Sequence, residues 1–115
     1  MKREPPIPPR PELVRRPSRS FGWLDDRLLI ERWLERVGPH GTSVLTLLAL
    51  AADRRGASFW SREKMSRALS TPRSDVDWAL GRLRELELVD HRPWIPRHHD
   101  GVWQLLPVPP PPWRT

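Results

Sequence analysis

The chain has 115 residues, 15 of them proline, and a net charge of +6, which leaves room for one small domain with proline-rich ends. It has no cysteine, so a disulfide framework and a thiolate site are both excluded. Its longest apolar stretch, residues 44–52, is too short to span a bilayer, and we expect no membrane partner.

The excess of positive charge is concentrated at one end of the sequence. Residues 1–20 carry six basic and two acidic side chains, a net charge of +4, whereas residues 21–95 carry twelve and eleven, a net charge of +1. Residues 96–115 add a further +1. An attraction to nucleic acid therefore depends on how charge is arranged on the domain surface, or on the first twenty residues.

Residues 1–20 have too many prolines for a helix and too few apolar groups for a core, so we predict a disordered arm. Arg15, Arg16 and Arg19 lie next to the domain, where they would follow phosphates or enter a minor groove. An arm that only keeps the chain soluble is an equal alternative. Residues 5–10 also match a PxxPxR polyproline ligand, although a simple spacer is favoured over a peptide that binds a partner.

Two helices are predicted in the first half of the domain. A stripe of apolar residues at helical spacing predicts a helix over residues 23–37. This helix is expected to end at residues 38–41, which contain two glycines and a proline. The stripe consists of Ile30, Trp33, Leu34 and Val37. Leu24 and Leu28 lie off it, where they would pack under the N-terminal segment or contact a second copy in a homodimer. Residues 42–55 are apolar nearly all round, which is typical of a helix buried on several sides.

Residues 61–88 predict two short helices with a break between them, and the rest of the chain is expected to support this pair. Ser61 is the expected N-cap of the first helix. Thr71 is the expected N-cap of the second, with Pro72 at its first position, where a missing amide costs nothing. The apolar stripe of the second helix is Val76, Ala79, Leu80, Leu83 and Leu86. Its opposite face is left for solvent or a partner.

Strand composition appears before and after this helical pair. Residues 57–60 can form a short strand, and residues 88–92 and 102–106 have the composition of a hairpin with a loop of Pro, His and Gly between them. Trp94 and Trp103 are expected to cover the core from this hairpin. Residues 107–115 are again rich in proline and are predicted to leave the domain as an extended tail, so the domain covers residues 21–106.

The run ADRRGASFWSREKMSRALSTPRSDVDWALGRLRELELVDHR, residues 52–92, resembles the winged helix-turn-helix domain of bacterial replication-initiator and small transcription-regulator proteins. The matching positions are Ala52, residues 54–56, Ser61, Ala68, Leu69, Val76, Ala79, Leu80, Leu83 and residues 86–89. The resemblance implies a mainly α fold with a small β-hairpin wing. It also implies a DNA-binding protein, cytoplasmic and associated with the nucleoid, that regulates transcription or assists replication or a mobile element.

The outer face of the second helix is the predicted contact with double-stranded DNA, because the N-terminal end of a recognition helix enters the major groove. Arg73 would make a bidentate contact with guanine, Ser74 would reach a base or phosphate, and Arg82 would meet the backbone. Asp77 repels phosphate and would have to accept a cytosine amino group or pair with Arg73. The other candidates are Thr71 at the helix start, Arg92, Arg97, His98 and His99 of the wing, and Arg15, Arg16 and Arg19 of the arm.

Trp78 lies away from the apolar stripe, and three readings of it stay open. It would pack on a thymine methyl or a sugar, anchor a protein partner, or fold onto the wing or a terminal segment. The second reading belongs to an alternative function, a winged-helix adaptor that binds a protein through Trp78 and the proline-rich ends. The near-neutral domain and the acidic residues on the contact helix favour this alternative.

No catalytic constellation is visible, and we expect a non-enzymatic protein without a cofactor. Acidic residues alternate with arginines along helix faces, which is typical of a solvated surface. The group His91, His98, His99 and Asp100 lacks a cysteine and helical ligand spacing, so polar wing residues are favoured over a metal site.

Overall fold

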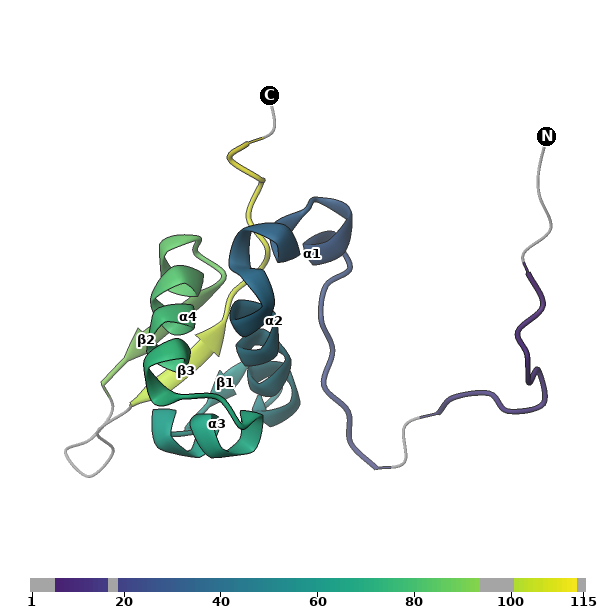
Figure 1. Ribbon diagram of the computed structural model, residues 1–115, viewed down its shortest axis with the longest axis horizontal. Coiled ribbons are helices and arrows are strands. Elements are labelled where there is room, and N and C mark those ends of the chain that lie inside the picture. Colours follow the sequence, from purple (N-terminus) through teal and green to yellow (C-terminus); the bar gives the residue numbers. More distant parts are fainter. Residues whose placement is uncertain (1–5, 17–18, 94–100, 114–115) are drawn as a thin grey trace.

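The computed structural model describes residues 6–16, 19–93 and 101–113, which form a mixed helical domain with a small antiparallel sheet (Figure 1). The elements in chain order are α1 (Arg27–Ile30), α2 (Trp33–Ala51), β1 (Ala57–Ser58), α3 (Arg62–Leu69), α4 (Arg73–Glu85), β2 (Val89–Arg92) and β3 (Val102–Leu105). The strand order is β1-β3-β2, so the last strand lies in the middle of the sheet. None of the described helices is long and apolar enough to cross a membrane.

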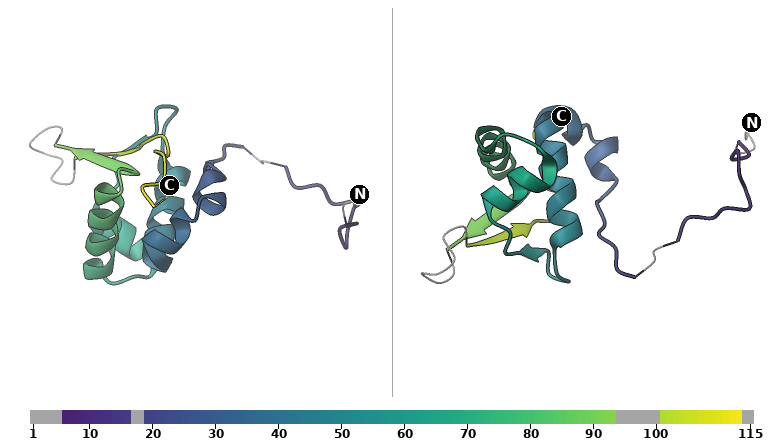
Figure 2. Two further views of the ribbon diagram at one scale, coloured as in Figure 1. Left: turned by 90° about the horizontal axis from the view of Figure 1, so that it is seen from above. Right: turned by 60° about the horizontal axis from the view of Figure 1, so that its bottom comes forward.

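The core is built around α2, which lies between α4 and α1 (Figure 2). Its buried side chains meet the apolar stripe of α4 and the inward face of β3. The side chains with less than 2% of their surface exposed include Trp33, Val37, Val44, Leu48, Met65, Val76, Leu83, Val89 and Trp103. The predicted stripe of α4 is confirmed at Val76, Ala79, Leu80 and Leu83, which are all buried, while Leu86 is half-buried. One face of α4 is therefore committed to the core.

The hairpin of β2 and β3 follows α4 directly, as the sequence predicted. Val89 pairs with Leu105 and His91 pairs with Trp103, and β1 joins the other edge of β3. Gly101 immediately precedes β3 and has a φ of +68°, and a Cβ atom there would lie 2.3 Å from the carbonyl oxygen of Arg92. Only glycine fits this close approach without displacing the backbone. The loop between the strands, with the candidate wing residues Arg97, His98 and His99, lies outside the described residues.

The helix predicted over residues 23–37 is wrong in its first half. The helical backbone of α1 covers four residues, and Arg32 turns the chain with a φ of +67° before α2 begins. A carboxylate oxygen of Asp25 accepts a hydrogen bond from the Arg27 amide at 2.9 Å, which fixes the start of α1 near this point. Because of the turn, Ile30 is 68% exposed, whereas Leu28, placed off the predicted stripe, is 6% exposed and joins the core.

The predicted break at residues 38–41 exists as a kink inside α2. Gly38 has a φ of +73° and a ψ of −179°, which is not helical, and Pro39 follows it. The helix resumes after the kink and ends at Ala51, four residues earlier than predicted. This helix contacts α1, α3, α4, β1 and β3, so the prediction that it is buried on several sides is confirmed, although Leu50 near its end is 69% exposed.

A tight turn built on Asp53 links α2 to β1. Its carboxylate accepts hydrogen bonds from the amides of Ala57 at 3.0 Å and Arg55 at 2.8 Å, which lower the pKa of Asp53 below its usual value. Because the folded pKa is lowered, the stabilisation is complete above the unfolded value of about 3.9 and is lost as the pH falls through the folded pKa.

We therefore expect Asp53→Asn to lower the melting temperature at pH 6, where the native carboxylate is fully charged. The difference between the two proteins should shrink steadily below about pH 4, as the native carboxyl group becomes protonated. Thermal unfolding followed by circular dichroism over this pH range measures it. A difference in melting temperature that does not change with pH would show that the charge of Asp53 is irrelevant to the turn.

The two helices α3 and α4 begin in different ways. Ser61 caps α3, as predicted, because its hydroxyl accepts a hydrogen bond from the Lys64 amide at 3.1 Å. The prediction for Thr71 is wrong: its hydroxyl donates to the carbonyl of Leu69 at 3.0 Å, and the N-cap position of α4 is occupied by Pro72. The Thr71 side chain is thus used by the turn between the helices and leaves the first amides of α4 without a side-chain cap.

This difference predicts unequal effects of two similar substitutions. We expect Ser61→Ala to lower the free energy of unfolding by about 1 kcal/mol, the usual cost of removing an N-cap. Thr71→Ala should cost less than about half of that, because its hydroxyl bonds a carbonyl that keeps other ways of being satisfied. Urea unfolding of both variants measures the two values. Equal losses, or a larger loss for Thr71→Ala, would contradict the assignment of the caps.

The proline-rich segment 107–113 packs on the domain and does not leave it as the sequence suggested. Two guanidinium nitrogens of Arg27 donate to the carbonyl oxygens of Val108 and Pro109 at 2.7 and 3.1 Å. The ring of Trp113 meets Trp33 edge to face with centroids 4.5 Å apart, and its indole nitrogen donates to the carbonyl of Glu31 at 3.1 Å. These contacts bring Val108 into the core and pack Trp113 against it.

The described part of the N-terminal arm runs away from the domain on the side of α1, opposite to α4 (Figures 1 and 2). Residues 6–16 and 19–20 contain no helix or strand and are exposed. The described part of the arm therefore adds nothing to the core.

Candidate functional site

The exposed side of α4 carries most of the residues that the sequence singled out. We call this surface the α4 outer face; it consists of Arg73, Ser74, Asp77, Trp78, Gly81, Arg82 and Glu85. Arg73, Ser74, Asp77 and Trp78 are exposed, and Arg82 keeps about a third of its side chain in solvent. Since the opposite side of α4 is buried against α2, the helix presents this face outward along its whole length.

Asp77 lies between two arginines at the centre of this face. Its carboxylate oxygen is 3.9 Å from Nε of Arg73, one helical turn earlier, and 3.4 Å from Nε of Arg62 on α3. From the sequence, we expected Asp77 either to accept a hydrogen bond from a cytosine amino group or to pair with Arg73. In the structure, Asp77 forms the pair with Arg73. Both groups are about half exposed, so the pair contributes roughly 1 kcal/mol or less and can open when a partner approaches.

A second group of charges lies further along α4. Nε of Arg82 donates to the carbonyl oxygen of Arg36 on α2 at 3.4 Å, and its Nη1 is 3.4 Å from the Glu85 carboxylate. The guanidinium of Arg36 lies over the ring of Trp113, 4.7 Å from the centroid. Arg82 is therefore held partly along the surface of the domain.

Trp78 stands beside a shallow hollow of about 540 Å³ on the α4 outer face. The hollow is lined by Arg36, Asp77, Trp78, Gly81, Arg82 and Glu85. A Cβ atom at Gly81 would meet nothing within 4 Å, so the missing side chain leaves the space next to the indole open. Trp78 is 60% exposed, and the C-terminal segment, which could have covered it, packs on Trp33 instead. The described terminal segments thus leave Trp78 available to a partner.

The remaining candidates are distributed unevenly. Thr71 is half-buried, and its hydroxyl is already used by the turn. Arg92 is exposed at the end of β2, while Arg97 and His98 lie outside the described residues. The arm residues Arg15, Arg16 and Arg19 are exposed, but the arm leaves the domain on the side away from α4, so the structure does not bring them to the α4 outer face (Figure 1).

Two arginines that sequence reasoning did not select lie beside the α4 outer face. Arg62 comes from the start of α3 and also stacks over Trp103 at 5.0 Å, and Arg36 comes from α2. No local pattern marks either of them, because their position depends on how α2, α3 and α4 pack. With Arg73 and Arg82 they place four guanidinium groups around two carboxylates, those of Asp77 and Glu85.

The side chains of the α4 outer face carry guanidinium, carboxylate, hydroxyl and indole groups. Within residues 6–16, 19–93 and 101–113, no cluster of three His, Asp or Glu side chains is placed to hold a metal ion. The comparisons of this chain with protein-family models, with curated proteins and with solved structures give no match.

Proposed function

We propose that this chain is a non-enzymatic DNA-binding protein with a winged helix-turn-helix fold. In this proposal α3, the turn at residues 70–72 and α4 are the helix-turn-helix, and β2 and β3 are the wing. The open first half of the α4 outer face, with Arg73 and Ser74 exposed, is the observation that carries the proposal. A face sealed by other parts of the chain would have been incompatible with entry into a major groove.

The contacts divide into those that read bases and those that hold the backbone. Arg73 leaves Asp77 and makes a bidentate contact with guanine, and Ser74 reaches a neighbouring base or phosphate. Arg82, with Arg62 and Arg36 beside it, meets phosphates and fixes the position of α4. Asp77 then lies near the bases, where it accepts a hydrogen bond from a cytosine amino group. A carboxylate at this place adds selectivity at a cost in general affinity.

Binding to duplex DNA tests the proposal directly. A pool of random duplexes should give an enriched sequence that contains guanine, and the affinity for that sequence should fall as salt rises. The slope of log affinity against log salt should be about −0.9 for each phosphate neutralised. An enriched site with two repeated halves would indicate that a dimer binds. Retention of no duplex, or a binding constant that is independent of salt, would contradict the proposal.

A second function is favoured by one specific observation, the exposed Trp78 beside its hollow. Aromatic residues in such positions anchor protein partners, and the mixed charges around the hollow suit a polar rim. In this case the chain is an adaptor that binds a protein. Trp78→Ala would then release a partner that wild-type protein retains from a cell extract, while duplex DNA would not be shifted by either protein.

The cellular role follows from the first proposal and shares its test. In this proposal the protein is cytoplasmic and associates with the nucleoid. It acts there as a regulator of transcription or as an accessory of replication or of a mobile element. Mapping of the bound sites in cells would separate these roles, since regulators occupy promoters and replication accessories occupy origins.

A further inference from the structure

A large groove lies between α2 and the central strand of the sheet, and none of its lining residues belongs to α3 or α4. We call it the α2–β3 groove; its volume is about 780 Å³. It is bounded by residues 21–25 and Leu28, by α2 at Leu45 and Ala49, by the turn 52–56, and by Leu88 and residues 104–108. Sites for small molecules in proteins commonly measure roughly 300–1,000 Å³, so the groove has the capacity for one.

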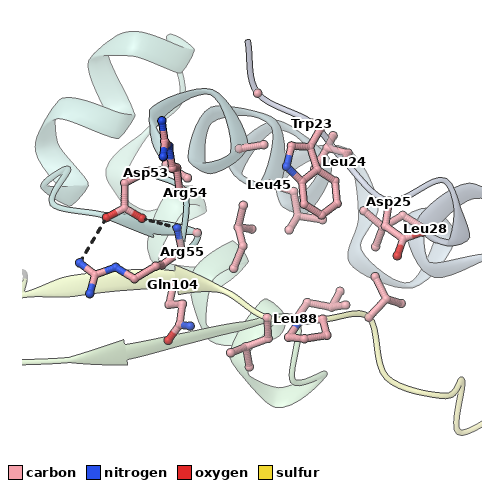
Figure 3. Close-up of a pocket in the computed structure, with 18 of the residues that line it drawn as sticks. Trp23, Leu24, Asp25, Leu28, Leu45, Asp53, Arg54, Arg55, Leu88 and Gln104 are labelled. Carbon is pink, nitrogen blue, oxygen red and sulfur yellow. Dashed lines mark hydrogen bonds and ion pairs between the residues drawn. The ribbon is translucent and has the colours of Figure 1, made fainter. Parts of the chain in front are cut away.

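The walls of this groove are apolar over most of their length. Figure 3 shows Trp23, Leu45 and Leu88 in the middle, with Asp53, Arg54 and Arg55 at one end and Asp25 and Leu28 at the other. Leu45 and Leu88 are buried, and they continue into the core.

Along one edge of the groove, no described segment shields the large apolar side chains from water. Phe21 and Trp23 are 68% and 74% exposed, and Leu24 is 42% exposed. Their backbone is nevertheless held close to the domain, since a Cβ atom on Gly22 would lie 2.3 Å from the carbonyl oxygen of Ala49. This segment therefore lies along α2 with its side chains beside an open groove, which favours a ligand that buries them.

The charge at the two ends determines what kind of ligand fits. At the turn, the Asp53 carboxylate is already used by the amides of Arg55 and Ala57 and lies 3.7 Å from Arg55. No ion pair joins Arg54 to another described residue. At the other end, Asp25 accepts a hydrogen bond from the amide of Arg27. The turn thus provides a guanidinium that an anion can approach, next to apolar walls.

We propose that the α2–β3 groove binds a small amphipathic anion, a molecule with an aliphatic or flat apolar body and one carboxylate or similar acidic group. The apolar body lies against Trp23, Leu45 and Leu88, and the acidic group meets Arg54. Binding covers Trp23 and Leu24 and gives Arg54 the partner that it lacks in the described chain. The α4 outer face takes no part, so this proposal is independent of the proposed function.

Three probes with the same ten-carbon chain and different head groups test the inference: decanoate, decanol and decyltrimethylammonium. Isothermal titration of the full chain, below the concentrations at which the probes form micelles, should show one decanoate per chain. Decanoate should bind at least about tenfold more tightly than the other two, because only its carboxylate forms a charge-assisted hydrogen bond with a guanidinium.

Two substitutions separate the head-group contact from the apolar one. Arg54→Glu should weaken decanoate about tenfold or more and should no longer disfavour decyltrimethylammonium. Trp23→Ala should weaken all three probes by a similar factor. Arg67→Glu is the matched control, since Arg67 is an exposed arginine on α3 outside the groove, and it should leave all three affinities unchanged. Circular dichroism of each variant checks that it folds.

Three results would overturn the proposal. Equal affinities for the three probes would show an apolar patch without a site for an anion. An absence of binding in a folded protein would show that the groove takes no such ligand. A stable dimer in light scattering of ligand-free protein, with Trp23→Ala returning it to a monomer, would show that a second copy covers this groove instead.

Discussion

Trp113→Ala is expected to lower the free energy of unfolding by about 2–3 kcal/mol, although the residue lies in a segment that the sequence places outside the domain. Removal of a buried tryptophan side chain costs roughly 3–5 kcal/mol, and Trp113 is only partly buried. The substitution removes the edge-to-face contact with Trp33, the cation–π contact with Arg36 and the hydrogen bond to the carbonyl of Glu31. Guanidinium chloride unfolding measures the loss.

Trp78→Ala is the matched control, because it deletes the same side chain from a position that is 60% exposed. We expect it to change the free energy of unfolding by no more than about 0.5 kcal/mol, as is usual for surface substitutions. If both variants lost the same stability, Trp113 would contribute no packing and segment 107–113 would be a free tail after all. A larger loss for Trp113→Ala would support the docked arrangement and would also account for the fully buried Trp33.

Arg73→Ala is expected to lower the affinity for the selected duplex by about 10- to 100-fold and to relax the preference for guanine at one position. A good bidentate contact contributes roughly 1–3 kcal/mol of discrimination against the wrong base. Fluorescence anisotropy with the selected duplex and with its variants at that position measures both effects. Arg55→Ala removes the same charge from a side chain that is 87% exposed in the turn after α2, and it should change the affinity little.

Asp77→Asn should act in the opposite direction on general affinity. The substitution removes a negative charge that faces phosphates and releases Arg73 and Arg62 from their ion pairs, so we expect non-specific duplex binding to strengthen about threefold to tenfold. Discrimination at the neighbouring base should decrease at the same time. If neither Asp77→Asn nor Arg73→Ala changed the affinity for duplex DNA or the discrimination between bases, the α4 outer face would not be the DNA contact. The adaptor function would then be preferred.

Part of the fold could be predicted from the sequence because it depends on neighbours along the chain. The stripe of Val76, Ala79, Leu80 and Leu83 repeats with the period of a helix, and any helix with that pattern must bury it. Ser61 caps α3 through an amide three residues away. The short strands after α4 also follow from local composition. The structure adds their register, that is, which residues of β2 and β3 pair with each other.

Predictions failed where a local pattern had a competitor elsewhere in the fold. The apolar stripe that includes Ile30 suggested one continuous helix over residues 23–37. The turn at Arg32 interrupts this helix, so Leu28 enters the core and Ile30 stays exposed. The proline-rich end has no helical or strand signal and was therefore expected to be free. It packs because Arg27 donates to its carbonyls and Trp33 receives Trp113, and neither partner is near it in the sequence.

The sequence by itself determined that α4 has one apolar face and one polar face, with Arg73, Asp77 and Trp78 on the polar side, since helical geometry alone assigns residues to faces. Only the tertiary structure decided what surrounds that polar face. The packing of α2 and α3 against α4 brings Arg36 and Arg62 to it, and the docking of segment 107–113 on Trp33 keeps Trp113 away from Trp78. These contacts join residues far apart in the chain, so no periodicity or local capping pattern could encode them.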